Sequence, residues 1–119
     1  NEFTLNKDFS YTKPKAFIFR GKEYEVNSWR ELYEGVCCQL YKENNRRFRN
    51  LAVDPDLKGT KRNYFNIGDD VGMDRPVELG DGVFIETHLD SNRVAEFLKR
   101  LLKKLDYDIN DLNIKLKKD

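Results

Sequence analysis

Two stretches of this chain repeat apolar side chains at the spacing of an α-helix, each along one face only. The first carries them at i, i+3, i+4, i+7, i+8, i+11 and i+12: Trp29, Leu32, Tyr33, Val36, Cys37, Leu40 and Tyr41. The second carries them at i, i+3, i+4, i+7, i+8 and i+11: Val94, Phe97, Leu98, Leu101, Leu102 and Leu105. Because such a helix must bury its single apolar face, both are predicted to pack against a sheet.

Both predicted helices have a start signal. Ser28 and Glu31 form a capping box, in which the hydroxyl accepts from the third helical N–H and Glu31 reaches back. Asp90 or Ser91 is placed to cap the second helix. A further short helix is predicted over residues 44–53, and Asp-Pro-Asp at 54–56 ends it.

Alternating apolar and polar residues predict β-strands before and after each of the two helices in the sequence. Residues 15–26 predict a hairpin that turns at Gly21, and residues 83–89 and 112–116 predict single strands. Shorter strands are expected at 64–67 and 76–79. Residues 1–14 are predicted to be a tail or linker, with a weak strand left open and four side chains suited to docking: Phe3, Leu5, Phe9 and Tyr11.

The predicted order is β-β-α-(α)-β-β-α-β, which is typical of an α+β fold. We expect a two-layer sandwich with two amphipathic helices on one face of a four- to five-stranded sheet. A chain of 119 residues suits one domain, assigned to residues 15–119. The first residue is Asn1 rather than Met, which predicts a piece of a longer protein.

Composition narrows the class of protein. The sequence is 39% apolar and 13% aromatic, which argues against disorder. Its net charge of +1 gives no global field toward nucleic acid or membrane. No apolar run approaches the ~20 residues that span a bilayer, and no signal peptide is visible. We therefore expect no membrane partner and a cytoplasmic location, and leave the oligomeric state open.

The two cysteines, Cys37 and Cys38, are adjacent. Neighbouring cysteines rarely bridge each other because the ring is strained, so a disulfide scaffold is excluded and a reducing compartment is favoured. Cys37 falls inside the apolar stripe and is predicted to be a small core side chain. With His88 as the single histidine, soft metal ligands are too few, and neither metal nor cofactor is expected.

Charge is segregated along the sequence. Between Lys42 and Arg62 there are seven basic residues and three acids, whereas between Asn66 and Asp90 there are seven acids and one arginine. A basic run followed by aromatic residues is typical of a surface that grips phosphate and stacks a base. The candidate nucleic-acid-binding residues are Arg46, Arg47, Arg49, Lys58, Lys61, Arg62, Tyr64 and Phe65. The alternative is a solvated basic loop that an acidic loop neutralises.

No catalytic motif is present, and no catalytic or metal-binding residue is assigned. Asp81 and Glu86 resemble the acidic pair of a metal-dependent nuclease, but His88 stands where a lysine is expected. The loop at 68–82 lacks the ligand spacing of an EF-hand, and no glycine-rich phosphate-binding motif occurs. The chain is therefore expected to be a binding module rather than an enzyme.

Three segments, at 17–41, 58–65 and 82–116, together resemble a small accessory domain found at the C-terminal ends of bacterial restriction-type and mobile-element proteins. The resemblance covers residues 15–117 and implies a context rather than an activity. Lys61, Arg62, Tyr64 and Phe65 match the basic turn of that domain, and Glu86, Thr87, His88 and Leu89 match a strand end. The chain departs from the pattern at Asn63, where that domain has Pro, and at His88, where it has Asn.

Three functions follow, in order of preference. The first is a non-catalytic accessory domain that contacts nucleic-acid backbone in a restriction- or defence-type protein. The second is a protein–protein or intramolecular docking domain of a larger bacterial protein. The third is a metal-dependent nuclease.

Overall fold

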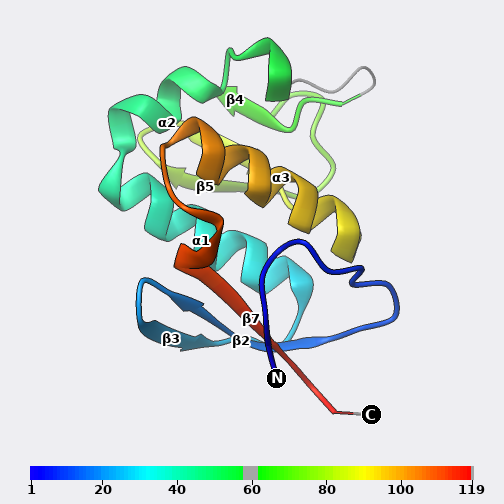
Figure 1. Cartoon of the computed structure of the whole chain (residues 1–119). Coiled ribbons are helices and arrows are strands. Elements are labelled where there is room, and N and C mark those ends of the chain that lie inside the picture. Colours follow the sequence, from blue (N-terminus) through cyan, green and yellow to red (C-terminus); the bar gives the residue numbers. More distant parts are fainter. Residues whose placement is uncertain (58–61, 119) are drawn as a thin grey trace. The chain divides into compact units, whose positions relative to one another are not determined.

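The computed structural model describes residues 1–57 and 62–118 (Figure 1). These residues form three α-helices and two antiparallel sheets of four and three strands, so the fold is mixed α and β, as the sequence predicts. The helices are α1 (Trp29–Glu43), α2 (Asn45–Leu51) and α3 (Ser91–Lys104). Two 3-10 turns follow α2 and α3, respectively: η1 (Pro55–Leu57) and η2 (Ile109–Asp111). The chain divides into two compact units, Asn1–Val36 with Leu89–Asp119, and Cys37–His88; the division falls inside α1.

The first unit contains the four-stranded sheet, in the order β1-β7-β2-β3. Its strands are β1 (Glu2–Phe3), β2 (Pro14–Phe19), β3 (Lys22–Glu25) and β7 (Leu112–Leu116). The predicted hairpin is β2–β3, and Arg20 (φ 50°) and Gly21 (φ 85°) make its turn, because a tight hairpin needs positive φ at both central residues. Figure 1 shows β2 between β3 and β7. Strand β7, near the end of the chain, thus pairs with β2 of the hairpin, which lies near its start.

The N-cap hydrogen bonds expected for both helices of the first unit are confirmed. Ser28 Oγ accepts from the Glu31 N–H at 3.1 Å, and Asp90 Oδ1 accepts from the Arg93 N–H at 2.8 Å, so Asp90 caps α3. At the other end of α3, Tyr107 N–H donates to the Leu102 carbonyl (2.8 Å) and Asp106 N–H to that of Lys103 (3.2 Å). This is a Schellman motif, with Asp106 (φ 63°) in the place that glycine usually takes.

The N-terminal segment is tied to the first unit. Phe3 pairs with Ile114 of β7, and the side chains of Leu5 and Phe9 are buried. The Phe9 ring lies 4.8 Å from the Trp29 ring, centroid to centroid. Tyr11, in contrast, is fully exposed.

The second unit contains the three-stranded sheet, in the order β4-β6-β5. Its strands are β4 (Phe65–Ile67), β5 (Pro76–Gly80) and β6 (Val83–Glu86). The expected single sheet of four to five strands is therefore two sheets. Strand alternation does not specify which strands pair, and β6 pairs with β4 and β5 rather than with a strand of the larger sheet.

Candidate nucleic-acid interface

The basic residues of α2 lie on its solvent side. Phe48 and Leu51, three residues apart, are the buried residues of this short helix, and the Phe48 ring meets the Tyr41 ring edge-on at 5.8 Å. Arg46 and Arg47 are consequently exposed, as is Lys42 in the last turn of α1. Three cationic side chains are thus presented within six consecutive residues. We call Lys42, Arg46 and Arg47 the junction cations.

Arg49 has a different place from its neighbours. It is half-buried, and its Nη1 donates to the Asp81 carbonyl at 2.7 Å. The Tyr41 hydroxyl lies 3.2 Å from both the Gly80 carbonyl oxygen and Asp81 Oδ2. Residues 80–82 all have positive φ, and these contacts hold their turn between β5 and β6. Arg49 therefore supports the turn instead of extending the exposed cationic surface.

The aromatic residues of the predicted site face inward. Tyr64 and Phe65 are only 9% and 6% exposed, and the Phe65 ring packs edge-on against Phe48 at 6.3 Å. The expectation that one of them stacks a base is corrected by this burial, because neither ring presents a face to solvent. Adjacency to a basic run indicated exposure, but β4 pairs with the central strand β6 and turns Phe65 into the core.

Arg62 remains exposed, and its Nη1 lies 3.4 Å from the His88 carbonyl oxygen. Lys58 and Lys61, the other two basic candidates, lie outside the described residues. The structure therefore brings together part of the predicted site: the junction cations and Arg62 are exposed in one unit, Arg49 is engaged, and the two aromatic residues are internal.

Glu86 holds the loop before β5. Its carboxylate is 0% exposed and accepts from the backbone N–H groups of Asp74 (2.5 Å), Arg75 (2.9 Å) and His88 (2.8 Å). Burial alone would raise its pKa, but the hydrogen bonds from these backbone groups outweigh burial and hold the pKa below its usual value. Thr87 adds its own pair of bonds to the Arg75 carbonyl, from its N–H (3.0 Å) and its hydroxyl (2.6 Å). No sequence pattern around Glu86 or Thr87 indicates this role.

These contacts give the Asp81 and Glu86 pair a structural explanation. The Glu86 carboxylate already accepts hydrogen bonds from backbone N–H groups, and Asp81 lies in the turn that Tyr41 and Arg49 hold. His88 meets Glu86 through its backbone; its Nε2 is 3.7 Å from the Asp74 carboxylate instead. Among residues 1–57 and 62–118, no group of three or more His, Cys, Asp and Glu side chains is arranged to hold a metal ion. Cys37 is buried, as predicted, and Cys38 is half-buried.

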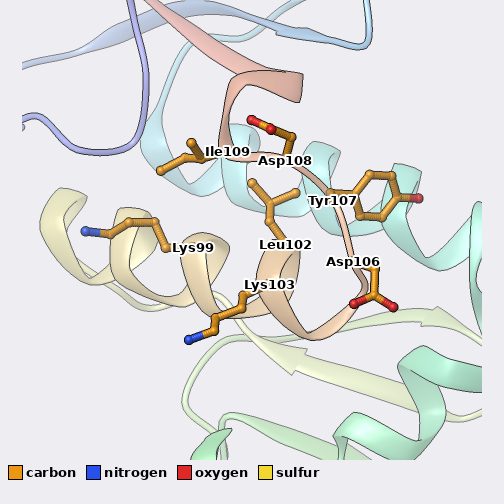
Figure 2. A pocket seen from close by; sticks show the side chains of 7 residues that line it. All are labelled: Lys99, Leu102, Lys103, Asp106, Tyr107, Asp108 and Ile109. Carbon is orange, nitrogen blue, oxygen red and sulfur yellow. The ribbon is translucent and has the colours of Figure 1, made fainter.

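A hollow of about 620 Å³ in the first unit was not predicted. It lies at the end of α3, lined by Lys99, Leu102, Lys103, Asp106, Tyr107, Asp108 and Ile109 (Figure 2). Figure 2 shows the two lysines and two aspartates pointing in different directions around Leu102. The Tyr107 ring packs on Phe19 at 5.6 Å. Charged groups of both signs that do not converge define no ligand, so we assign none to this hollow.

No protein-family model matches the chain, and no curated protein or solved structure shows significant similarity to it. In the part of the chain that the structure describes, no helix is long and apolar enough to cross a membrane.

Proposed function

We propose that the chain is a non-catalytic accessory module that contacts the backbone of nucleic acid through the junction cations. The observation that carries the proposal is that Lys42, Arg46 and Arg47 are exposed on helices whose apolar residues are buried. Ammonium and guanidinium groups bind phosphate oxygens with charge-assisted hydrogen bonds. Residues 42–51 hold four basic side chains and one acid, Glu43, so the local charge favours a polyanion.

Arg62 extends the cationic surface of the same unit, and Lys58 and Lys61 join the proposal on the sequence alone. Contacts of this kind position a protein on nucleic acid and carry no sequence information. The parent protein we propose is of the restriction or defence type, bacterial and cytoplasmic, since the resemblance described above implies that setting.

The test is a titration of labelled single- and double-stranded oligonucleotides at ~50 mM salt, repeated as salt rises. Each phosphate neutralised should lower log affinity by about 0.7 to 0.9 per tenfold increase in salt. Arg46→Ala with Arg47→Ala should weaken binding to all sequences about equally. Lys15→Ala with Lys22→Ala, which removes the same charge from exposed positions of the first unit, is the matched control. Absence of binding at micromolar protein would overturn the proposal.

A docking domain is the second candidate, and exposed apolar side chains favour it. Val53, Ile67 and Val71, all in the second unit, are exposed although solvent-facing positions are more often polar. This function predicts no nucleic-acid binding, and instead an association with another domain of the parent protein. That association should weaken when Val53→Asp and Val71→Asp are introduced, and should persist when the junction cations are replaced.

A further inference from the structure

We infer that the first unit carries a separate site that binds single-stranded nucleic acid by stacking a base on Tyr11. The inference rests on the proposed function for its ligand class, and it adds a surface that the basic run does not contain. The site is a hollow of about 350 Å³ where the two ends of the described chain meet. It is lined by Asn1, Phe3, Lys7, Tyr11, Thr12, Leu116, Lys117 and Lys118.

Tyr11 has two unusual properties at once. Its side chain is 103% exposed, so its ring gains nothing from burial. Its backbone is left-handed (φ 59°), a conformation that a bulky side chain rarely adopts. A strained residue of this kind persists only where its surroundings enforce it, and such residues cluster at binding sites.

The surroundings of Tyr11 do enforce its position. Phe9 is anchored through its backbone: its N–H donates to Asn92 Oδ1 (2.8 Å), and its carbonyl accepts from the Ser91 hydroxyl (2.9 Å). The same carbonyl accepts from the Thr12 hydroxyl at 2.6 Å.

On the other side of Tyr11, Trp29 Nε1 donates to the Thr12 carbonyl at 3.0 Å. Residues two before and one after Tyr11 are therefore fixed, and the ring is presented to solvent by an ordered turn. Because the backbone is already ordered, a ligand that covers the ring has only the side-chain rotamer of Tyr11 left to fix.

The charge of the hollow selects an anionic ligand. Lys7, Lys117 and Lys118 line it, and none of the described residues that line it is Asp or Glu. The Lys117 N–H donates to the Lys13 carbonyl (2.8 Å), which brings a fourth exposed lysine alongside. The Lys117 ammonium is itself 3.5 Å from the Asn27 carbonyl, a long contact that a phosphate can replace.

The same turn also contains one carboxylate, that of Asp8, which is held in its charged form. It accepts from the Ser10 N–H (2.9 Å) and from Asn92 Nδ2 (3.1 Å). The hydrogen bonds from Ser10 and Asn92 lower the pKa of Asp8, so it is a carboxylate already engaged within the turn.

An exposed ring beside several lysines is the combination that binds a single strand, because each base offers a flat face and each phosphate a charge. In a duplex the bases are stacked on one another and their faces are not accessible to Tyr11. The ligand is therefore a single strand, recognised without sequence preference.

The experiment compares labelled oligothymidylate with a duplex of the same length on wild-type protein, Tyr11→Ala, Tyr11→Phe and Lys117→Ala with Lys118→Ala. Tyr11→Ala should weaken single-strand binding about 5- to 150-fold, the loss of one base stack, and leave duplex binding unchanged. Tyr11→Phe should retain binding, since the ring remains. The lysine variant should flatten the salt dependence of single-strand binding.

The two proposals fail separately in this design. Single-strand binding that Tyr11→Ala does not alter overturns the inference, as does equal binding of inorganic phosphate or an acidic peptide. Duplex binding that Arg46→Ala with Arg47→Ala does not alter overturns the proposed function instead. Single-strand binding that depends on Tyr11, in a protein that binds no duplex, would leave the inference standing alone.

Discussion

Each unit contains a turn that is held by hydrogen bonds between side chains and backbone, but the chemistry of these bonds differs. In the first unit the neutral groups of Asn92, Ser91 and Trp29 fix the backbone of residues 9–12. In the second unit the carboxylate of Glu86 fixes the backbone of residues 74 and 75. The first turn presents an aromatic ring to solvent, whereas the aromatic pair of the second unit, Tyr64 and Phe65, is internal. A rigid turn is therefore a candidate binding site only when it presents a suitable side chain to solvent.

The largest effect is expected at Glu86. Glu86→Ala leaves three backbone N–H groups without their charged acceptor, and hydrogen bonds to charged groups contribute about 1.5 to 3 kcal/mol each. We expect a loss of about 3 kcal/mol or more in the free energy of unfolding, measured by chemical denaturation. Asp70→Ala, at an exposed position of the same unit, should change stability by less than ~0.5 kcal/mol. A loss at Glu86 as small as the control's would show that the loop stands without the carboxylate.

A smaller effect is expected at Asn92, because its bonds are neutral or exposed. Asn92→Ala removes the acceptor of the Phe9 N–H and should lower the free energy of unfolding by about 1 to 2 kcal/mol. It should also weaken single-strand binding by less than Tyr11→Ala does, since the ring remains but is held less firmly. Asn110→Ala, an exposed asparagine of the same unit, serves as control. Unchanged binding in Asn92→Ala would separate the stability of the turn from its proposed function.

The local elements of both units were predictable and the contacts that fix the turns were not. Apolar spacing located α1 and α3, and capping acts over only three residues, so the sequence placed the cap of α3 at Asp90 or Ser91; the structure shows that it is Asp90. Strand alternation located β6 but cannot tell which strands lie beside it, so two sheets were read as one. The contacts that fix the turns join residues that are distant in the sequence: Asn92 and Phe9 are 83 residues apart, and Glu86 and Asp74 are 12 apart. Local sequence patterns do not report such contacts.

For the candidate site, the sequence predicted the cluster of basic residues but not which side chains are buried. Arg46 and Arg47 stand in the first turn of a short helix whose buried residues are Phe48 and Leu51, so their exposure could be expected. The inward direction of Phe65 depends on its pairing with Ile85 twenty residues later, which nothing near Phe65 in the sequence signals. The sequence predicts Tyr11 only as a side chain suited to docking, and its exposed turn is anchored at the distant Asn92 through Phe9.

The two turns should also differ in their response to acid. The pKa of Glu86 is lowered in the folded protein from its ordinary 4.5, so Glu86 contributes stability above the unfolded pKa and loses that contribution as pH falls through the folded pKa. Denaturation of wild type and Glu86→Gln between pH 7 and 3 should therefore show a stability difference that narrows below about 4.5. The difference between wild type and Asn92→Ala should narrow more weakly in acid, because the Asn92 hydrogen bond is only one of several that lower the pKa of the exposed Asp8. A constant gap between wild type and Glu86→Gln would contradict the assignment.

The smallest effect, and the one that most directly separates stability from binding, is expected from Tyr11→Gly. Glycine adopts a φ of +59° without the clash that a Cβ brings, a relief of about 1 kcal/mol that the greater freedom of glycine in the unfolded chain partly offsets. We expect stability to stay level or rise by a few tenths of a kcal/mol while single-strand binding falls as far as in Tyr11→Ala. Asp106→Gly is the matched control, since Asp106 (φ 63°) belongs to the same unit and ends α3 where glycine is usual. It should be as stable as wild type or more so, and should bind the single strand unchanged. If Tyr11→Gly clearly destabilised the protein, the ring would have a packing role that its exposure conceals, and the strained tyrosine would need no ligand to explain it.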